Sequence, residues 1–264
     1  MDLQLQGKTA FVSGSTAGIG YAIAELLAAE GASVFVNGRT PERTAAAVEK
    51  IRKAHQEAQV AGVAGDLGTP AGAQAVFDAL PDLDILINNV GIFEVRAFEE
   101  IDDADWERFF QTNVMSGVRL SRTYLPKMLK KNWGRIIFIS SESAVQIPTE
   151  MIHYGMTKTA QLAIGRGLAE LTAGTDVTVN SVLAGPTYSE GVGDFVSQMA
   201  SQQNTSKEKV ESDFFINARP TSLLKRFATP TEVANMVVYL SSPLASATNG
   251  AAIRADGGVV KTIL

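Results

Sequence analysis

Tyr154 and Lys158 stand four residues apart, and Ser141 precedes the tyrosine by thirteen residues. Residues four apart share one face of an α-helix, so this spacing places a phenol beside an ammonium. An ordinary tyrosine has a pKa of about 10, and a neighbouring cation favours the phenolate and lowers that pKa. The pair therefore predicts a group that exchanges protons with an alcohol or a carbonyl oxygen. The alternative is a surface pair worth about 0.3 kcal/mol.

The composition excludes several classes of function. The chain has 264 residues, 45% of them hydrophobic, which fits one large α/β domain with a sizeable core. The net charge is −5, so a general nucleic-acid role is not expected. No cysteine and only two histidines are present, which excludes disulfides and leaves no credible metal site.

No targeting or membrane signal is found in the sequence. Residues 1–6 lack the basic and apolar regions of a signal peptide, and no run reaches the roughly 18 apolar residues of a membrane span. A cytoplasmic protein without a membrane partner is therefore expected.

Short apolar runs alternate with longer helical patterns along the chain. The runs are continuously apolar, which is typical of strands buried on both faces of a parallel sheet. We expect strands at 9–13, 34–37, 60–64, 85–88, 135–140, 178–183 and 251–254, and helices at 19–30, 41–57, 70–80, 102–131, 151–171 and 231–240. Thr40 and Thr69 are expected helix caps, each followed by a proline in the first turn. This alternation predicts one α/β domain over residues 1–264, a doubly wound parallel sheet of about seven strands with helices on both faces.

Residues 185–226 interrupt the alternation. Apolar residues recur there at helical spacing, namely Val192, Phe195, Val196 and Met199, and then Val210, Phe214 and Phe215. Two short amphipathic helices are expected. Long excursions inside compact domains are often functional, so the segment is predicted to be a substrate lid, the alternative being an ordinary surface insertion.

A glycine-rich stretch follows the first expected strand and leads directly into a helix. Gly14, Gly18 and Gly20 let the backbone turn sharply and approach a ligand closely, and Ser15 and Ile19 lie in the same loop. The helix N-terminus offers free N–H groups to a diphosphate. The stretch therefore predicts a dinucleotide site.

The end of the second expected strand bears on which dinucleotide binds. Binders of NAD usually place an acidic residue here, whereas this chain has Gly38 followed by Arg39. Arg39 could bind a 2′-phosphate, so NADP(H) is favoured, with NAD(H) as the alternative.

Taken together, the motifs resemble the short-chain dehydrogenase/reductase family from Gly7 to Gly258. The motifs are Ser13 to Gly20, Asp66-Leu67, Asn88-Asn89-Val90-Gly91, Asn113, Ser140-Ser141, Tyr154 to Lys158, Asn180 to Gly185 and Asp256-Gly257-Gly258. Val90 and Ala184 depart from the family pattern, which has alanine and proline there, and Ser13 replaces a threonine. The resemblance implies a Rossmann-type fold.

The resemblance also implies a role for each matching residue. Tyr154 would be the general acid/base, Ser141 would bind the substrate oxygen, and Lys158 would bind the nicotinamide ribose and depress the pKa of Tyr154. Asn113 would hold a water that links Lys158 to solvent. The remaining positions would contact the nucleotide: Asp66 and Leu67 the adenine, Asn88 and Gly91 the ribose side, and Thr187 and Ser189 the carboxamide.

The implied activity is an NAD(P)(H)-dependent interconversion of a carbonyl and a secondary alcohol. A 3-oxoacyl-thioester reductase is the commonest such role; a sugar, polyol or steroid dehydrogenase and a non-catalytic dinucleotide-binding regulator are the alternatives. The family usually forms homodimers or homotetramers, and a homotetramer is expected, with residues 259–264 in a second interface. The expected pocket residues are Ile92, Phe93, Glu142, Ser143, Ile147, His153, Phe195, Phe214 and Phe215, with His153 in a core or surface role rather than a catalytic one.

Overall fold

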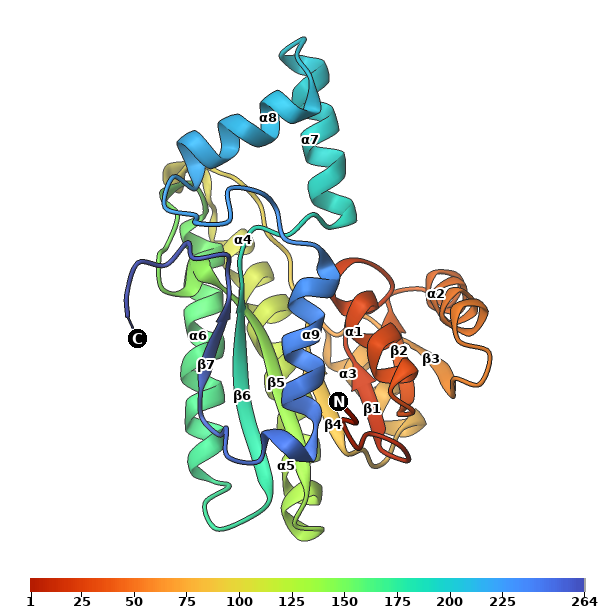
Figure 1. The fold of residues 1–264 in the computed structure, drawn as a ribbon. Coiled ribbons are helices and arrows are strands. Elements are labelled where there is room, and N and C mark those ends of the chain that lie inside the picture. The colour runs from red at the N-terminus through yellow and green to blue at the C-terminus, as the bar shows by residue number, and fades with distance from the viewer. Residues whose placement is uncertain (264) are drawn as a thin grey trace.

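The computed structural model describes residues 1–263, except for the side chain of Phe195. Among these residues, seven strands form one parallel sheet in the order β3-β2-β1-β4-β5-β6-β7 (Figure 1). The strands are β1 (Thr9–Val12), β2 (Ser33–Gly38), β3 (Val60–Ala64), β4 (Ile85–Asn88), β5 (Gly134–Ser141), β6 (Val177–Ala184) and β7 (Ala252–Ala255). The predicted doubly wound sheet is confirmed, and every expected strand lies within one residue of its expected ends.

Helices cover both faces of this sheet (Figure 1). One face packs against α1 (Gly18–Ala29), α2 (Pro41–Ala54) and α9 (Pro230–Ser241), and the other against α3 (Pro70–Ala79), α5 (Ser116–Lys130) and α6 (Ile152–Glu170). Neighbouring strand residues enter opposite cores, because successive side chains of a strand point to opposite faces. Ile137 thus joins the first core and Phe138 the second. Both faces are buried, which explains why the strands read as continuous apolar runs.

The predicted helix starts agree with the local capping. The hydroxyls of Thr40 and Thr69 accept hydrogen bonds from backbone N–H groups in the first turns of α2 and α3. Asp102 caps α4 (Asp103–Phe109) in the same way, at 2.8 Å from the amide of Asp105. Short helical turns occur at Phe98–Glu100, Glu142–Ala144, Thr149–Met151 and Pro243–Ala245.

The helix expected at 102–131 is present, but it is interrupted. A π-helical turn at Phe110–Met115 separates α4 from α5. A π turn breaks the regular i→i−4 hydrogen-bond pattern, and such turns are frequent at functional sites. The turn contains Asn113, one of the predicted site residues.

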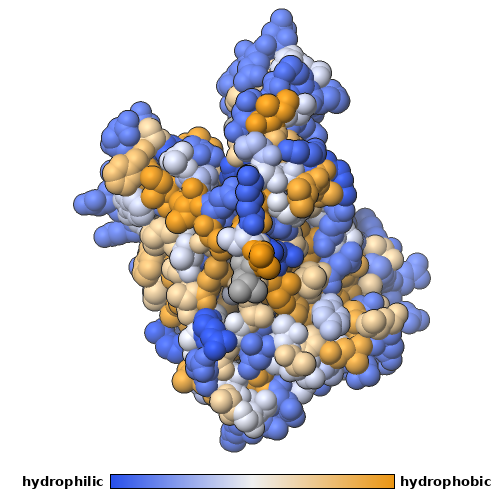
Figure 2. Space-filling model, turned by 60° about the vertical axis from the view of Figure 1, so that its left-hand side comes forward, coloured by the Kyte–Doolittle hydropathy of each residue, from blue (hydrophilic) through white to orange (hydrophobic). Residues whose placement is uncertain are grey.

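Residues 185–226 project from the carboxyl end of the sheet, as Figure 1 shows for α7 (Glu190–Gln202) and α8 (Lys207–Asp213). A second π turn, Phe214–Ala218, follows. The two expected helices are confirmed, and Val196 and Ala200 of α7 and Val210 of α8 form a small core with Phe215 and Phe227. Figure 2 shows the projecting part from another side, with apolar surface between it and the rest of the molecule.

The strand order places a crevice at the carboxyl ends of β1 and β4. The chain runs outward from β1 to β3 and then returns to β4 on the other side of β1. Ligands of open α/β sheets bind at such a reversal. Within residues 1–263, no helix has the length and apolar character needed to cross a membrane.

Candidate active site

The glycine-rich loop after β1 forms a backbone cradle with no room for side chains. Gly14 and Gly18 have φ angles of +59° and +57°, which L side chains rarely adopt. A Cβ on Gly20 would lie 2.4 Å from the Asn89 side chain and 2.5 Å from the Gly14 carbonyl. Ala17 precedes α1 without any side-chain cap, so the first N–H groups of the helix are not used by a capping side chain. This cradle fits the diphosphate of a dinucleotide.

Two asparagines hold the cradle in place. The Asn37 side chain accepts a hydrogen bond from the amide of Gly14 at 3.0 Å, and the Asn89 amide donates to the carbonyls of Ser13 and Gly14 at 3.0 and 2.9 Å. Asn88, the predicted ligand contact, instead donates to Ser121 at 3.1 Å and is buried, so it joins β4 to α5. Asn89 was in the quoted motif but had no predicted role.

The predicted adenosine-side residues follow β2 and β3. Arg39 is exposed just after Gly38 and makes no ion pair within the described residues. The Asp66 carboxylate accepts from the amide of Gly68 at 3.0 Å, and Leu67 is buried in the core. A Cβ at Gly38 would lie 2.5 Å from Thr16, so β2 ends close to the glycine-rich loop.

Ser141, Tyr154 and Lys158 line one cavity of about 690 Å³. Ser141 ends β5, and its hydroxyl accepts from the amide of Ser143 at 3.1 Å. Tyr154 and Lys158 lie one turn apart on α6, with the ammonium 5.6 Å from the centroid of the phenol ring. The cavity also includes Ile19, Asn89, Gly91, Thr187 and Ser189, so the dinucleotide cradle and the proposed proton-transfer residues face the same space.

Burial dominates the ionisation of both α6 residues. It raises the pKa of Tyr154 to about 12, against a smaller lowering by a hydrogen bond with Ser141. It lowers the pKa of Lys158 to about 8. The expectation that Lys158 depresses the pKa of Tyr154 is therefore not met in this structure, because desolvation outweighs the nearby charges and the ammonium points to other acceptors.

The Lys158 ammonium has two hydrogen-bond acceptors among the described residues. The Lys158 ammonium donates to the Ile139 carbonyl at 2.9 Å and to the side-chain oxygen of Gln161 at 3.3 Å. The Gln161 amide in turn donates to the backbone carbonyl of Asn113 at 2.6 Å. The structure thus joins two of the predicted residues, Lys158 and Asn113, through Gln161, which the sequence interpretation missed.

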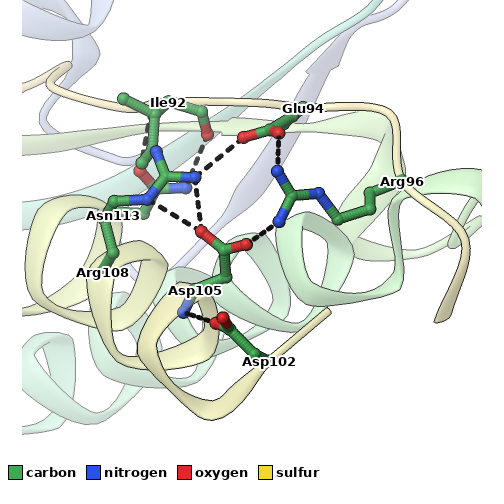
Figure 3. A network of polar contacts seen from close by, with 7 residues as sticks. All are labelled: Ile92, Glu94, Arg96, Asp102, Asp105, Arg108 and Asn113. Atoms are coloured by element: carbon green, nitrogen blue, oxygen red, sulfur yellow. Dashed lines mark hydrogen bonds and ion pairs between the residues drawn. The ribbon is translucent and has the colours of Figure 1, made fainter. Parts of the chain in front are cut away.

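The Asn113 side chain holds the loop after β4. Its oxygen accepts from the amide of Ile92 at 2.8 Å, and its nitrogen donates to the Ile92 carbonyl at 2.9 Å and to the Thr157 hydroxyl at 3.0 Å. All of its amide groups are therefore used within the protein. Figure 3 shows this contact beside a cluster of charged side chains.

That cluster fixes the wall of the cavity. Arg108 contacts Glu94 and Asp105, each at 2.8 Å, and Arg96 contacts the same two carboxylates from the other side (Figure 3). Glu94 and Arg96 lie on the loop after β4, whereas the other two lie on α4. The four charges tie this loop to α4 and position Phe93 and Val95, which line the cavity.

The other wall contains a buried ion pair. Arg219, after α8, contacts Glu142 at 2.7 Å and Glu150 at 3.3 Å, and the side chains of Arg219 and Glu142 are 8% and 4% exposed. The second oxygen of Glu142 accepts from the Ser143 hydroxyl at 2.6 Å. The pair joins the 185–226 segment to the residue after Ser141.

The predicted substrate-side residues divide into two groups. Ile92, Phe93, Glu142, Ser143 and Phe214 line the cavity, whereas Ile147, His153 and Phe215 do not. His153 is buried with its ring 3.9 Å from that of Phe109, in agreement with the expected core role. Phe215 belongs to the small core of the projecting segment. The prediction for Phe195 concerns a side chain outside the described part.

Thr187 and Ser189, the predicted carboxamide contacts, lie where the 185–226 segment leaves the sheet. The Thr187 hydroxyl donates to the Gly185 carbonyl at 2.9 Å, and Ser189 caps α7. A Cβ on Gly18 would lie 3.3 Å from the Ser189 Cβ, so this turn passes directly over the glycine-rich loop.

Comparison with known proteins agrees with this arrangement. A family model described as short chain dehydrogenase matches residues 8–200. The chain belongs to the short-chain dehydrogenase/reductase family. Among its relatives, the Bacillus subtilis (strain 168) uncharacterized oxidoreductase YvaG is 50% identical, with 100% of both chains covered. The 3-oxoacyl-[acyl-carrier-protein] reductase FabG of Aquifex aeolicus (strain VF5) is 33% identical, covering 98% of this chain and 100% of its own.

A solved structure of the same fold is the L-sorbose reductase from Gluconobacter frateurii, complexed with NADPH and L-sorbose. It superposes with a TM-score of 0.93 at 31% identity over 100% of both chains. These similarities show a short-chain dehydrogenase/reductase with a Rossmann-type fold, and the chain is an oxidoreductase of that family.

Two residues of this short-chain dehydrogenase/reductase site, Gln161 and Arg219, were missed by the sequence interpretation, and only Gln161 had a signal in the sequence. Gln161 lies three residues after Lys158, so its helical spacing alone places it on the same side of α6. No comparable signal joins Arg219 to Glu142, which are separated by 77 residues. Within residues 1–263, no group of three His, Asp or Glu side chains could hold a metal ion.

Proposed function

We propose that the protein is an NADP(H)-dependent oxidoreductase that interconverts a carbonyl group and a secondary alcohol. The observation that carries this proposal is the cavity that Ser141, Tyr154 and Lys158 share with Ile19 of the glycine-rich loop and with Asn89, which holds that loop. Tyr154 and Lys158 are both intact, the first half-buried and the second buried, which argues against the alternative of a non-catalytic regulator.

In the reductive direction, Tyr154 would give its proton to the substrate carbonyl oxygen, and Ser141 would donate a hydrogen bond to the same oxygen. Two donors aimed at one oxygen stabilise the charge that develops there. A bound nicotinamide would supply the hydride, or accept it in the oxidative direction. The raised pKa of Tyr154, about 12, keeps the phenol protonated and suits proton donation.

The nucleotide would lie along the carboxyl ends of β1 to β4. Gly14, Ser15, Gly18, Ile19 and Gly20 would bind its diphosphate, because no capping side chain uses the first N–H groups of α1. The other contacts proposed are Asp66, Leu67 and Gly91 on the adenosine side, where Asn88 steadies the central strands through Ser121, and Tyr154, Lys158, Thr187 and Ser189 on the nicotinamide side.

NADP(H) is preferred over NAD(H) in this proposal. Gly38 supplies no carboxylate to the adenosine ribose, and the exposed Arg39 has no ion-pair partner within the described residues. A guanidinium in this position suits a phosphate. The similar L-sorbose reductase structure contains NADPH.

The substrate we favour is a small, uncharged, hydroxylated carbonyl compound such as a keto sugar. Glu142 and Arg219 place buried polar groups beside Ser141, and groups of this kind must be hydrogen-bonded. Arg219 already contacts two carboxylates, so it offers little net positive charge to an anionic substrate. A 3-oxoacyl thioester is the second candidate, supported by the apolar wall of Val192, Val196 and Phe214 and by the similarity to the Aquifex reductase.

Residues 185–226 are proposed to form a lid over this site. Val192, Val196, Val210 and Phe214 from this segment line the cavity, and Arg219 anchors its far end through a buried ion pair. The homotetramer and the cytoplasmic location stay predictions from the family resemblance; Leu264 of the expected second interface lies outside the described residues.

Replacement of the tyrosine tests this function. Keto sugars, 3-oxoacyl thioesters and steroids are offered with NADPH, and the loss of its absorbance is followed. Tyr154→Phe should lower kcat about 10²–10⁴-fold, the usual contribution of a positioned acid, with NADPH affinity retained. Tyr124→Phe is the matched control, because that phenol only donates to the Leu80 carbonyl in the core. Parental turnover in Tyr154→Phe would disprove the assigned role.

A further inference from the structure

The Gln161 carboxamide is the buried link between Lys158 and the π turn before α5. Its oxygen accepts from the Lys158 ammonium at 3.3 Å, and its nitrogen donates to the Asn113 carbonyl at 2.6 Å. Gln161 is 2% exposed, Asn113 1% and Lys158 5%. A carboxamide supplies both a donor and an acceptor, so one side chain satisfies two buried groups at once.

The π turn explains why the Asn113 carbonyl is available to a side chain. A π turn disrupts the regular helical hydrogen bonds, so a carbonyl within it can bond outside its own helix. The Asn113 side chain is fully used by Ile92 and Thr157. The contact with Gln161 is therefore made by the backbone oxygen of Asn113, whereas its side chain reaches α6 at Thr157.

The lysine ammonium depends on uncharged acceptors. Among the described residues its partners are the Ile139 carbonyl and the Gln161 oxygen, and no carboxylate pairs with it. Burial accordingly lowers the pKa of Lys158. Since an ammonium has three N–H groups, these two contacts leave one for another acceptor in the cavity.

We propose that Gln161 is a positioning residue, whose carboxamide stabilises the charged form of Lys158 and couples its position to the Asn113 turn. The catalytic consequence rests on the proposed function, in which Lys158 lies beside Tyr154 on the nicotinamide side. The sequence interpretation gave Asn113 a water that links Lys158 to solvent; in this structure the Gln161 side chain joins Lys158 to Asn113 directly.

The proposal predicts the direction in which the pKa of Lys158 changes when Gln161 is replaced. Removing the acceptor disfavours the ammonium, so the pKa of Lys158 should fall in Gln161→Met, a substitution close in size and in helix propensity. Gln161→Glu keeps an acceptor and adds a negative charge, so that pKa should rise. A purely structural role would change stability without moving the two variants in opposite directions.

The charged and titratable groups around this link stay the same in both variants. Tyr154 lies on the same helix, Glu142 follows β5, and Arg219 comes from the projecting segment. His153 turns away toward Phe109 on α4. A change in the pKa of Lys158 can therefore be attributed to the side chain at position 161.

The Lys158 pKa can be measured on the protein alone by NMR of 13Cε-labelled lysine, with the signal assigned by its loss in Lys158→Arg. We expect a fall of about one pH unit in Gln161→Met, the size of one hydrogen bond to a charged group. An unchanged value in that variant overturns the proposal. If Gln161→Met does not fold, Gln161→Glu provides the test, because an unchanged or lowered pKa of Lys158 in that variant also overturns the proposal.

Kinetics supply the second readout. The alkaline limb of kcat/KM, on which the charged form of Lys158 is lost, should move to lower pH by about one unit in Gln161→Met, because the ammonium then gives up its proton at lower pH. Tyr124→Phe, which also loses one buried hydrogen bond, should not show this change. If the Lys158 shift appears but Tyr154→Phe keeps full turnover, the proposed function fails and the positioning contact stands.

Discussion

The ion pair between Arg219 and Glu142 leads to a quantitative prediction about stability. Both side chains are more than nine-tenths buried, and their contact at 2.7 Å joins the projecting segment to the residue after Ser141. Arg219→Met removes the cation and leaves Glu142 with the Ser143 hydroxyl as its remaining side-chain partner. Breaking one side of a buried pair costs about 3–5 kcal/mol, because the other charge stays buried without compensation.

The second charge can be removed as well. In Arg219→Met/Glu142→Leu no uncompensated carboxylate is left at position 142, and apolar replacements of buried pairs are often neutral or stabilising. We therefore expect the double variant to recover most of the loss, with a coupling energy of about 2–3 kcal/mol between the two sites.

Urea unfolding followed by circular dichroism measures these free energies, and the melting temperature of Arg219→Met should fall by about 10 °C for a chain of this size. Arg226→Met is a matched control, since Arg226 pairs with Glu232 at 2.7 Å on the surface and should cost about 1 kcal/mol or less. Limited proteolysis checks whether the 185–226 segment opens first. The reasoning would be refuted if Arg219→Met lost no more free energy of unfolding than Arg226→Met. It would also be refuted if the double variant were no more stable than Arg219→Met.

Two further predictions concern the cofactor and pH. Arg39→Asp should shift the ratio of the NADP(H) and NAD(H) dissociation constants by about 10–100-fold toward NAD(H), as expected for a lost charge-assisted hydrogen bond. Lys53→Asp, on the exposed face of α2, is the control and should leave this ratio unchanged. The dissociation constants are measured by cofactor fluorescence, and an unchanged ratio in Arg39→Asp rejects the 2′-phosphate contact. Lys158 has a folded pKa of about 8, below its ordinary value of 10.5, so the unfolded chain binds the proton more tightly and burial of the charge destabilises the protein below pH 8. This cost, about 3 kcal/mol at most, should be relieved between pH 8 and about 10.5, so the parental protein should gain stability relative to Lys158→Met across that range; a pH-independent difference in urea unfolding would contradict the assignment.

The sequence by itself was sufficient for the architecture. Strand and helix periods are local properties of the backbone, so the apolar runs located every strand of the sheet, and Thr40 and Thr69 marked two helix starts. The spacing of Tyr154 and Lys158 placed both on one face of α6, because four residues make about one helical turn. The glycine-rich loop was likewise readable, since its positive φ angles require glycine.

Contacts between distant segments could be decided only by the tertiary structure. The pairing of Arg219 with Glu142, the π turn at Asn113 and the link through Gln161 depend on how α6, α5 and the projecting segment pack together. The ionisation of Tyr154 was misjudged for the same reason. Four-residue spacing brings an ammonium near, but burial and the direction in which that ammonium points determine the pKa, and both arise from the packing of the whole chain.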